Sequence, residues 1–467
     1  MPSIVTSKTK TKGPTAPVKV YRHISKLEFL NSELPSPFAS PFYYDNSMYS
    51  NSPPFTKETP FMANLVRATY LTSEDAEKQV IKMVLNLKGL GADFRPGDAI
   101  GILPRNDPKK VERLISLLKL SHMKDIPFII VPKDSNASES TPALPKHIKT
   151  PSTLQQALTY IDISGIAGKR LLMTLASYCS DRADHDELTQ WATCREDYNE
   201  FVEKRRFNVL DVLEEFTSCE PDISHLLDCL PPLMPRYFSM TDYSEANSEF
   251  SFVFSVVDFA IPNTEKRFQG VCTNWLAALA NSRIETKEKN KEMIAIPIFK
   301  KPSSNFTLPE DPTRPIIMVG TGTGVSPFVS FLEKIQQDMS NGIKVGKCML
   351  FVGYRHPLKD YLFKEKLEAF QKAGVLDSLI VAFSRLEDRI VYVQHRMQEH
   401  EYANELFQLM YAQNAIFYIC GDIKQVVPGI REAWTNILVS QGKTKTEAKE
   451  LLAQWIESRR YILDIWG

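Results

Sequence analysis

Residues 316–334, which read IIMVGTGTGVSPFVSFLEK, join an apolar strand to a turn of Gly and Thr and then to a helical pattern. Glycines let the backbone approach a phosphate closely, and the free N–H groups of a helix N-terminus favour negative charge. Pro327 suits the first turn of such a helix. The spacing is G-x-G-x-G rather than G-x-G-x-x-G, so a plain strand–helix turn is as good an interpretation as a nucleotide site.

A hydroxyl and a guanidinium, Ser384 and Arg385, end the strand predicted at 378–385. No acidic residue closes the strand before it, where a carboxylate would bind a ribose 2′-hydroxyl. Charged N–H donors bind phosphate strongly, and parallel strands hold ligands at their C-terminal ends. In isolation the two residues read as a surface pair. Together with the glycine turn they favour NADPH over NADH.

Three further stretches and the chain terminus carry residues suited to a flat cofactor. They are MPRYFSM (234–240), with a cation, two aromatic rings and a hydroxyl; RFQGVCTNWL (267–276), a helix start led by Gly; YICGD (418–422), with Cys420 at a strand end; and YILDIWG (461–467). Their plain interpretations are an aromatic strand face, a helix cap and a buried structural cysteine. Trp466 is either packed in the core or a lid over a flat ligand.

Two different patterns of predicted secondary structure position these residues. Apolar strands separated by helical stretches are predicted at 315–320, 347–354, 378–385, 415–422 and 459–466, which indicates a parallel sheet with ligands at the strand C-termini. Earlier strands are predicted at 79–87, 94–104, 250–259 and 292–299, and amphipathic helical patterns, such as 108–120 and 207–216, lie between 108 and 230. This first part reads as a β-barrel interrupted by a helical insert.

Composition limits the class of protein. At 467 residues the chain has room for about two or three domains. Lys+Arg and Asp+Glu balance at 56 each, so no overall field recruits nucleic acid or an anionic membrane. No apolar run approaches the roughly 18 residues of a membrane span. The seven cysteines include no C-x-x-C, which indicates reduced thiols without a zinc site and favours a cytoplasmic location. Residues 1–58 are rich in Ser, Pro, Thr and Asn and predict a disordered leader or linker.

The ordered set R-x-x-S, G-V-C-T, G-x-G-T-G, S-R with Y-V-Q, C-G-D and a terminal D-x-W resembles the FAD/NADPH module of the diflavin reductases, from about residue 60 onward. The resemblance implies an α+β and α/β fold. A ferredoxin-reductase-type β-barrel FAD domain would span 59–310, with its helical connecting insert at about 108–230. A doubly wound parallel-sheet NADPH domain would span 311–467. GVCTNWLAAL, YRHPLKDYLFKEKLEAF and YILDIWG are most similar to the branch of the family that serves cobalamin-dependent methionine synthase.

The resemblance also implies a role for each matching residue, and no metal. FAD would be bound by Arg236, Tyr237, Phe238, Ser239, Gly270, Val271, Cys272, Thr273 and Trp466. NADPH would be bound by Arg67, Thr323, Ser384, Arg385, Tyr392, Val393 and Gln394. Catalysis at the flavin and the nicotinamide would rest on Ser239, Cys420, Asp464 and Trp466.

Four positions depart from the family pattern. Phe238 stands where Tyr is usual, which removes one hydroxyl from the FAD site. Ile390, next to Arg389, replaces a usual Lys, and Gly429 replaces a usual acidic residue. Arg67 matches the family's cation on the first barrel strands only loosely. Weaker NADPH binding than in typical members follows from these changes.

The function that the resemblance implies is NADPH-dependent reduction of FAD, with electrons then passing singly to FMN. Residues 1–58 are too few for an FMN domain, so the FMN is expected on a flavodoxin-like partner or on a further domain. The final acceptor would be methionine synthase. Two alternatives stay open: a reductase for a haem protein, and a non-catalytic flavin-binding subunit. The retained residues that argue against the second alternative are Ser239, Cys420, Asp464 and Trp466.

Overall fold

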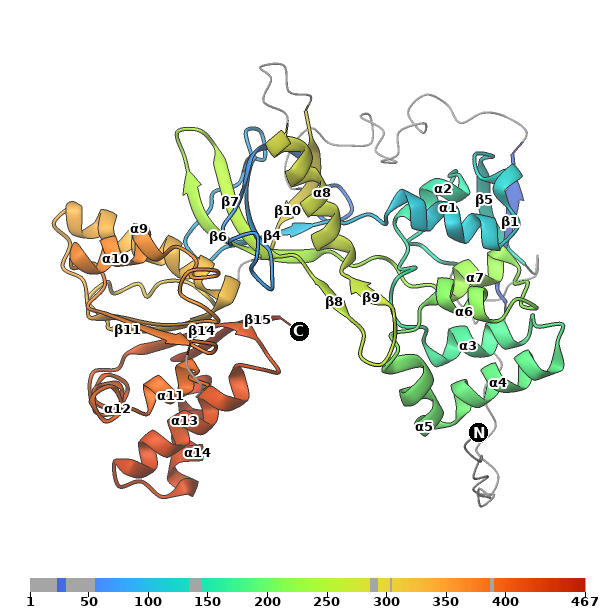
Figure 1. Ribbon diagram of the computed structural model, residues 1–467. Helices are drawn as coiled ribbons and strands as arrows, with labels where there is room; N and C mark the ends of the chain where they lie inside the picture. The colour runs from blue at the N-terminus through green and yellow to red at the C-terminus, as the bar shows by residue number, and fades with distance from the viewer. Residues whose placement is uncertain are drawn as a thin grey trace. The chain divides into compact units, whose positions relative to one another are not determined.

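The computed structural model describes residues 23–30, 55–133, 144–285, 293–302, 305–386 and 390–466 (Figure 1). The chain divides into two compact units. The first comprises Met1–Asp45, Arg105–Leu233 and Phe259–Phe268, and the second comprises Asn46–Pro104, Met234–Asp258 and Gln269–Gly467. All the predicted catalytic residues belong to the second unit.

The first unit is mainly helical, as the pattern between 108 and 230 predicts. Its helices are α1 (Pro108–Leu117), η2 (Ser121–Met123), α2 (Leu154–Thr159), α3 (Lys169–Ala176), α4 (Arg182–Thr193), α5 (Arg195–Asp197), η3 (Tyr198–Glu203), α6 (Val209–Glu215) and α7 (Ile223–Cys229). Helix α1 starts after Asp107, whose carboxylate accepts from the backbone N–H of Lys109. The core of this unit is built around large buried side chains, among them Trp191, Phe207 and Phe216.

One strand lies where the sequence predicts a leader without regular structure, and that prediction is wrong for this segment. Strand β1 (Ser25–Phe29) pairs antiparallel with β5 (Phe128–Pro132). The Asp228 carboxylate accepts the backbone N–H of Ser25 at 3.2 Å and its hydroxyl at 2.6 Å. Leu27 is buried in the core. The signal is missed because five residues are a short window and their strand partner lies a hundred residues away.

The first part of the second unit is a closed barrel, which confirms the predicted β-barrel. Its strands, in barrel order, are β10 (Ala295–Lys300), β2 (Phe61–Tyr70), β3 (Val80–Asn86), β7 (Glu249–Ser255), β6 (Arg236–Ser244) and β4 (Ala99–Ile102). The barrel closes because β10 pairs with both β2 and β4. Helix α8 (Val271–Glu285) contributes Leu276 and Ala280 to the barrel core. The short strands β8 (Asp258–Ala260) and β9 (Arg267–Gln269) form a separate two-stranded sheet, most of whose residues belong to the first unit.

The second part of this unit is a five-stranded parallel sheet in the order β13-β12-β11-β14-β15. The strands are β11 (Ile316–Thr321), β12 (Cys348–Tyr354), β13 (Ser378–Phe383), β14 (Ile416–Asp422) and β15 (Tyr461–Trp466). Four of them lie within the range that the sequence predicts, and β11 ends one residue beyond its range. The helices are η4 (Gly322–Val325), α9 (Ser326–Ser340), α10 (Lys364–Lys372), α11 (Val393–Met397), α12 (His400–Phe407), η5 (Gln408–Ala412), α13 (Val427–Ser440) and α14 (Lys445–Glu457).

Helices cover both faces of this sheet, which confirms the doubly wound fold (Figure 1). Alternate residues of β11 separate the two cores: Met318 packs with α9 and α10, and Val319 packs with α11, α13 and α14. Trp434 and Trp455 are buried on the second face, with ring centroids 5.2 Å apart. Both cores fix the strands, so the strand ends that carry the site are held rigidly. Among the helices that the structure describes, none combines the length and apolar character that a bilayer crossing requires.

Candidate nucleotide and flavin site

The glycine turn lies at the C-terminal edge of the parallel sheet. Strand β11 ends at Thr321, the 3-10 turn η4 follows, and α9 begins at Ser326. Gly322 has φ +54°, a conformation that favours glycine. A Cβ on Gly324 would lie 2.1 Å from the carbonyl oxygen of Cys420, so only glycine lets this turn sit against β14. Thr323 is half-buried in this turn, directly before the N-terminus of α9. Free N–H groups at a helix N-terminus are suited to binding a phosphate.

Ser384 and Arg385 extend the edge beyond strand β13. The backbone N–H of Ser384 donates to the carbonyl of Tyr354 at 2.9 Å, and that of Arg385 donates to the carbonyl of Arg355, also at 2.9 Å. These two hydrogen bonds tie the turn after β13 to the end of β12. The Arg385 guanidinium is exposed and forms an ion pair with Glu77, a residue of the β2–β3 loop.

Arg355 is a residue that the sequence reasoning missed. It follows the last residue of β12, and its Nη1 lies 2.8 Å from Oε1 of Glu77. Two guanidiniums, Arg355 and Arg385, therefore share one carboxylate at the end of neighbouring strands. The signal was available, because Arg355 directly follows the predicted strand 347–354, and Arg385 ends the next predicted strand.

The segment Tyr392–Gln394 opens helix α11. Tyr392 is exposed and its ring lies 5.6 Å from the ring of His395. Val393 is packed in the core, so any contribution to nucleotide binding comes from its backbone. A Cβ at Gly429 would lie 2.8 Å from the amide nitrogen of Gln394. The glycine that departs from the family pattern thus leaves room for the Gln394 side chain. The neighbouring Arg389 lies outside the described residues.

Among the described residues, Arg67 makes no contact with the strand ends that carry Thr323, Ser384 and Arg385. It forms a bidentate pair with Glu249 of β7 over the intervening strand β3, at 2.7 and 3.3 Å. This partner gives Arg67 a place in the barrel wall. Its role in NADPH binding stays a prediction.

The predicted catalytic residues Ser239, Cys420 and Asp464 come together from three strands. Parallel pairing of β14 with β15 places Cys420 directly beside Asp464. The Ser239 hydroxyl, on β6, donates to Oδ2 of Asp464 at 2.6 Å. The Cys420 thiol lies 3.9 Å from the same oxygen. A hydroxyl, a thiol and a carboxylate thus converge where the barrel meets the sheet inside this unit.

Lys301 is a second residue that the sequence reasoning missed. It follows β10, and its Nζ lies 3.9 Å from Oδ1 of Asp464 and 5.3 Å from the centre of the Tyr237 ring. The carboxylate therefore has a hydrogen-bond donor on one oxygen and a cation near the other. No local sequence signal marks Lys301, because it stands in a run of two lysines outside every motif.

The Cys420 thiol is held neutral. Burial raises its pKa well above the ordinary value, and the nearby Asp464 carboxylate adds to the rise. A protonated thiol is a weak hydrogen-bond donor rather than a nucleophile. The cluster can therefore orient a ligand and stabilise charge, while a thiolate reaction at Cys420 is disfavoured.

The side chains at the start of β6 differ in exposure: the first two are exposed and the third packs inward. Arg236 is exposed, and its Nη1 donates to the carbonyl of Met234 at 2.8 Å. Tyr237 is half exposed and meets Phe299 edge-on, at a ring distance of 6.1 Å. Phe238 packs on Phe252, with ring centroids 5.0 Å apart. An exposed cation and an exposed ring therefore stand next to Ser239, as a flavin site requires.

The start of helix α8 forms a tight backbone corner. The N–H of Gly270 donates to the carbonyl of Val257 at 2.8 Å, and the N–H of Val257 donates to the Thr273 hydroxyl at 3.1 Å. A Cβ on Gly270 would lie 2.9 Å from the Cβ of Val257. Cys272 is buried against the barrel, and burial raises its pKa to about 12. The first-turn N–H groups of Val271, Cys272 and Thr273 have no acceptor within the helix, which suits a pyrophosphate.

Trp466 is not part of the core. Its backbone carbonyl accepts from the N–H of Ile423 at 2.8 Å, which fixes the strand end. The residue as a whole is 46% exposed. Its side chain is therefore available to a ligand, and its role as a lid over a flat ligand stays a prediction.

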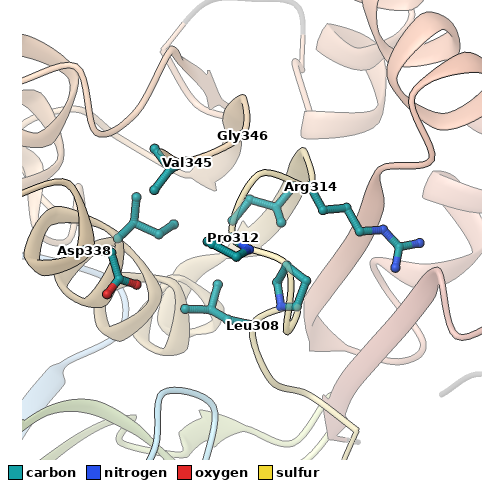
Figure 2. A pocket seen from close by; sticks show the side chains of 9 residues that line it. Leu308, Pro312, Arg314, Asp338, Val345 and Gly346 are labelled. Atoms are coloured by element: carbon teal, nitrogen blue, oxygen red, sulfur yellow. The ribbon is translucent and has the colours of Figure 1, made fainter. Parts of the chain in front are cut away.

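A pocket lies at the opposite, N-terminal edge of the sheet (Figure 2). It is lined by Leu308, Pro312, Ile316, Asp338 and Val345, among others. Arg314 also borders it, but its guanidinium points away, where Nε donates to the carbonyl of Asn414 at 2.7 Å. Because none of the predicted site residues line it, this pocket is not the candidate site.

Comparison with known proteins bears on this geometry. The family model for the FAD binding domain matches residues 53–275, and the model for the oxidoreductase NAD-binding domain matches residues 318–431. The chain carries the FAD-binding and NAD-binding domains of the diflavin reductases. The first model covers most of the barrel, and the second covers most of the parallel sheet. The resemblance seen in the sequence is therefore confirmed.

Two kinds of diflavin reductase are similar to the chain. Methionine synthase reductase of Homo sapiens is 34% identical over 429 residues, which cover 87% of this chain and 61% of that protein. The same enzyme of Mus musculus is also 34% identical, over 430 residues. NADPH–cytochrome P450 reductase of Cavia porcellus is 30% identical over 430 residues, or 90% of this chain and 61% of that protein. The chain spans about three fifths of the length of these curated relatives.

Proposed function

We propose that the chain is an NADPH-dependent FAD reductase that passes electrons from NADPH through FAD to FMN. The observation that carries this proposal is the cluster of Ser239, Cys420 and Asp464 from three strands, in which a hydroxyl and a thiol lie within 3.9 Å of one Asp464 carboxylate oxygen. The residues around it fit a flavin: an exposed cation at Arg236, exposed rings at Tyr237 and Trp466, and the helix corner at Gly270.

The proposed roles follow from this arrangement. When bound, FAD would supply the redox chemistry by accepting a hydride from the nicotinamide. The Ser239 hydroxyl would lie at the edge of the flavin ring. Its proton is donated to Asp464, so its oxygen would face the ring as an acceptor. Asp464 and Cys420 would stabilise positive charge that develops on the nicotinamide. Trp466 would cover the flavin face and move away when the nicotinamide enters.

The proposed domain limits are those of the sequence prediction: FAD binding at 59–310, with the helical insert at about 108–230, and NADPH binding at 311–467. The nucleotide would lie over the strand ends that carry Thr323, Ser384 and Arg385. Tyr392, Val393 and Gln394 would flank its 2′-phosphate. Both family matches fall largely within these limits.

Methionine synthase reductase is the finer function that we propose, with cobalamin-dependent methionine synthase as the acceptor protein and methionine biosynthesis as its setting. The relatives with 34% identity support it. A haem protein is the second candidate, favoured by the 30% identity to the P450 reductases. In either case an FMN domain or flavodoxin-like protein would mediate, because FAD takes two electrons and these acceptors take one at a time.

Anaerobic reduction of the purified chain tests the proposed activity. After reconstitution with FAD we expect stoichiometric FAD and no FMN, and loss of the yellow flavin absorbance when NADPH is added. Asp464→Asn should retain FAD and bleach more slowly. A chain that retains no flavin, retains FMN instead, or stays yellow with NADPH would contradict the proposal.

The acceptor is tested separately. We expect the chain to reduce ferricyanide with NADPH, and to reduce a protein acceptor efficiently only after a flavodoxin-like FMN protein is added. Methionine synthase with bound cobalamin and a cytochrome are the two acceptors to compare. A clear preference for the cytochrome would replace the methionine synthase proposal with the second candidate, and fast reduction of either without FMN would contradict the relay.

A further inference from the structure

The loop between β2 and β3 carries three acidic residues, Glu74, Asp75 and Glu77, onto the edge where the parallel strands end. Glu77 lies between two guanidiniums: its Oε2 pairs with Nη1 of Arg385, and its Oε1 lies 2.8 Å from Nη1 of Arg355. No family motif in the sequence includes this loop. Its position nevertheless puts a carboxylate on Arg385, the residue proposed to hold the NADPH 2′-phosphate.

The loop is held in this place by contacts of its own. The backbone N–H of Ser73 donates to the carbonyl of Lys359 at 3.0 Å, and Lys359 Nζ lies 2.6 Å from the Asp75 carboxylate. The Lys359 ammonium and the Ser73 hydroxyl, which donates to Asp75 Oδ1 at 2.6 Å, lower the pKa of Asp75 to about 2. Gln79 closes the loop by donating to the carbonyl of Ser73 at 3.1 Å. The ion pairs of Glu77 therefore rest on an anchored loop rather than on a free side chain.

We propose that Glu77 determines nucleotide specificity by competing with the 2′-phosphate for Arg385 and Arg355. Two guanidiniums around one anion form a site suited to a phosphate, since each presents several N–H donors. The Nη1 atom of Arg355 is buried and finds no hydrogen-bond acceptor among the described residues, even though Glu77 is near. Glu77 is thus an imperfect partner, and a phosphate with three acceptor oxygens would serve this nitrogen better.

The consequence differs for the two nicotinamide nucleotides. NADPH must displace the Glu77 carboxylate or bind next to a like charge, and both lower its affinity. NADH brings a ribose 2′-hydroxyl, which can donate to a carboxylate at a strand end. Glu77 therefore lowers the ratio of NADPH affinity to NADH affinity, without contact with the nicotinamide. This inference rests on the proposed function, because it takes the strand edge at Ser384–Arg385 as the 2′-phosphate site.

Glu77→Gln is the test variant, because it keeps the size of the side chain and removes its charge. Glu74→Gln is the matched control: it removes one charge from the same loop, and the Glu74 carboxylate has no ion pair within the described residues. Binding of 2′,5′-ADP and of 5′-AMP is measured by calorimetry on the FAD-loaded chain. These probes report the 2′-phosphate alone and require no turnover.

We expect Glu77→Gln to tighten 2′,5′-ADP binding about two- to tenfold, since exposed ion pairs are individually weak. Binding of 5′-AMP should change little, because the Glu77→Gln variant retains a side-chain oxygen that can accept from the ribose 2′-hydroxyl. The NADPH-to-NADH ratio of kcat/KM should therefore rise by about the same factor as 2′,5′-ADP affinity, through KM. Equal 2′,5′-ADP affinity in Glu77→Gln and Glu74→Gln, or weaker binding in Glu77→Gln, would overturn the inference. If the unaltered chain binds 2′,5′-ADP no better than 5′-AMP, the proposed NADPH site itself fails.

Discussion

The hydrogen bond between Ser239 and Asp464 gives the sharpest quantitative prediction. It is 2.6 Å long, its acceptor is a carboxylate whose side chain is 20% exposed, and it joins strand β6 to strand β15. A hydrogen bond to an ionised group contributes about 1.5–3 kcal/mol. Since Lys301 and some solvent also reach Asp464, the lower half of that range applies here, about 1.5–2 kcal/mol.

A double-mutant cycle isolates this contribution. We expect Ser239→Ala and Asp464→Asn each to slow flavin reduction by NADPH, and the double variant to lose much less than the sum of the two. A coupling free energy of about 1.5–2 kcal/mol corresponds to roughly 10- to 30-fold in rate. Stopped-flow reduction at saturating NADPH gives the rates, and bound FAD is quantified in every variant.

Ser244→Ala is the matched control for the cycle, because Ser244 ends the same strand and is outside the cluster. It should leave the rate unchanged. Effects of Ser239→Ala and Asp464→Asn that add within about 0.3 kcal/mol would refute the reasoning, because independent sites behave in that way.

Three further predictions concern the nucleotide, the lid and the thiols. Arg385→Ala should lower the NADPH-to-NADH ratio of kcat/KM by roughly tenfold, because a charge-assisted phosphate contact is lost; an unchanged ratio would place the 2′-phosphate elsewhere. Truncation after Ile465 should tighten NADP⁺ binding and increase use of NADH, measured by titration and steady-state kinetics, because no indole need be displaced; unaltered affinity would speak against a lid. The raised pKa of Cys272, about 12, means that the unfolded chain loses this proton first as the pH rises above about 9. The free energy of unfolding should therefore fall between about pH 9 and 12, by at most 1.4 kcal/mol per pH unit from this thiol, and Cys272→Ala should reduce the slope in urea titrations.

The strands of the parallel sheet and their order along the chain could be predicted from the sequence, for a physical reason. Strands such as β11 and β14 are buried on both faces, so they appear as continuous apolar runs that are easy to locate. Parallel pairing then brings their C-terminal ends to one edge without further information. The neighbouring positions of Cys420 and Asp464 follow from this rule, because both lie near the C-terminal ends of their strands.

Other features were beyond sequence reasoning because they depend on side chains that meet across long separations. Lys301 reaches Asp464 from the end of a barrel strand, and Glu77 reaches Arg385 from a loop more than three hundred residues earlier. Neither contact has a periodicity or a spacing. Strand β1 was missed for a related reason, since its partner is known only once the fold is known. Long-range ion pairs and edge pairings therefore require coordinates.

The cluster of Ser239, Cys420 and Asp464 joins the barrel to the sheet within one compact unit. Ser239 comes from the barrel, whereas Cys420 and Asp464 come from the sheet, so neither part alone can form the cluster. The hydroxyl of Ser239 is fixed by a carboxylate from β15, and Lys301 approaches the same carboxylate from β10. A flavin edge presented by the barrel and a nicotinamide presented by the sheet would thus meet at groups that already hold the two parts together. Substitutions that loosen this contact should therefore impair hydride transfer before they impair the binding of either cofactor.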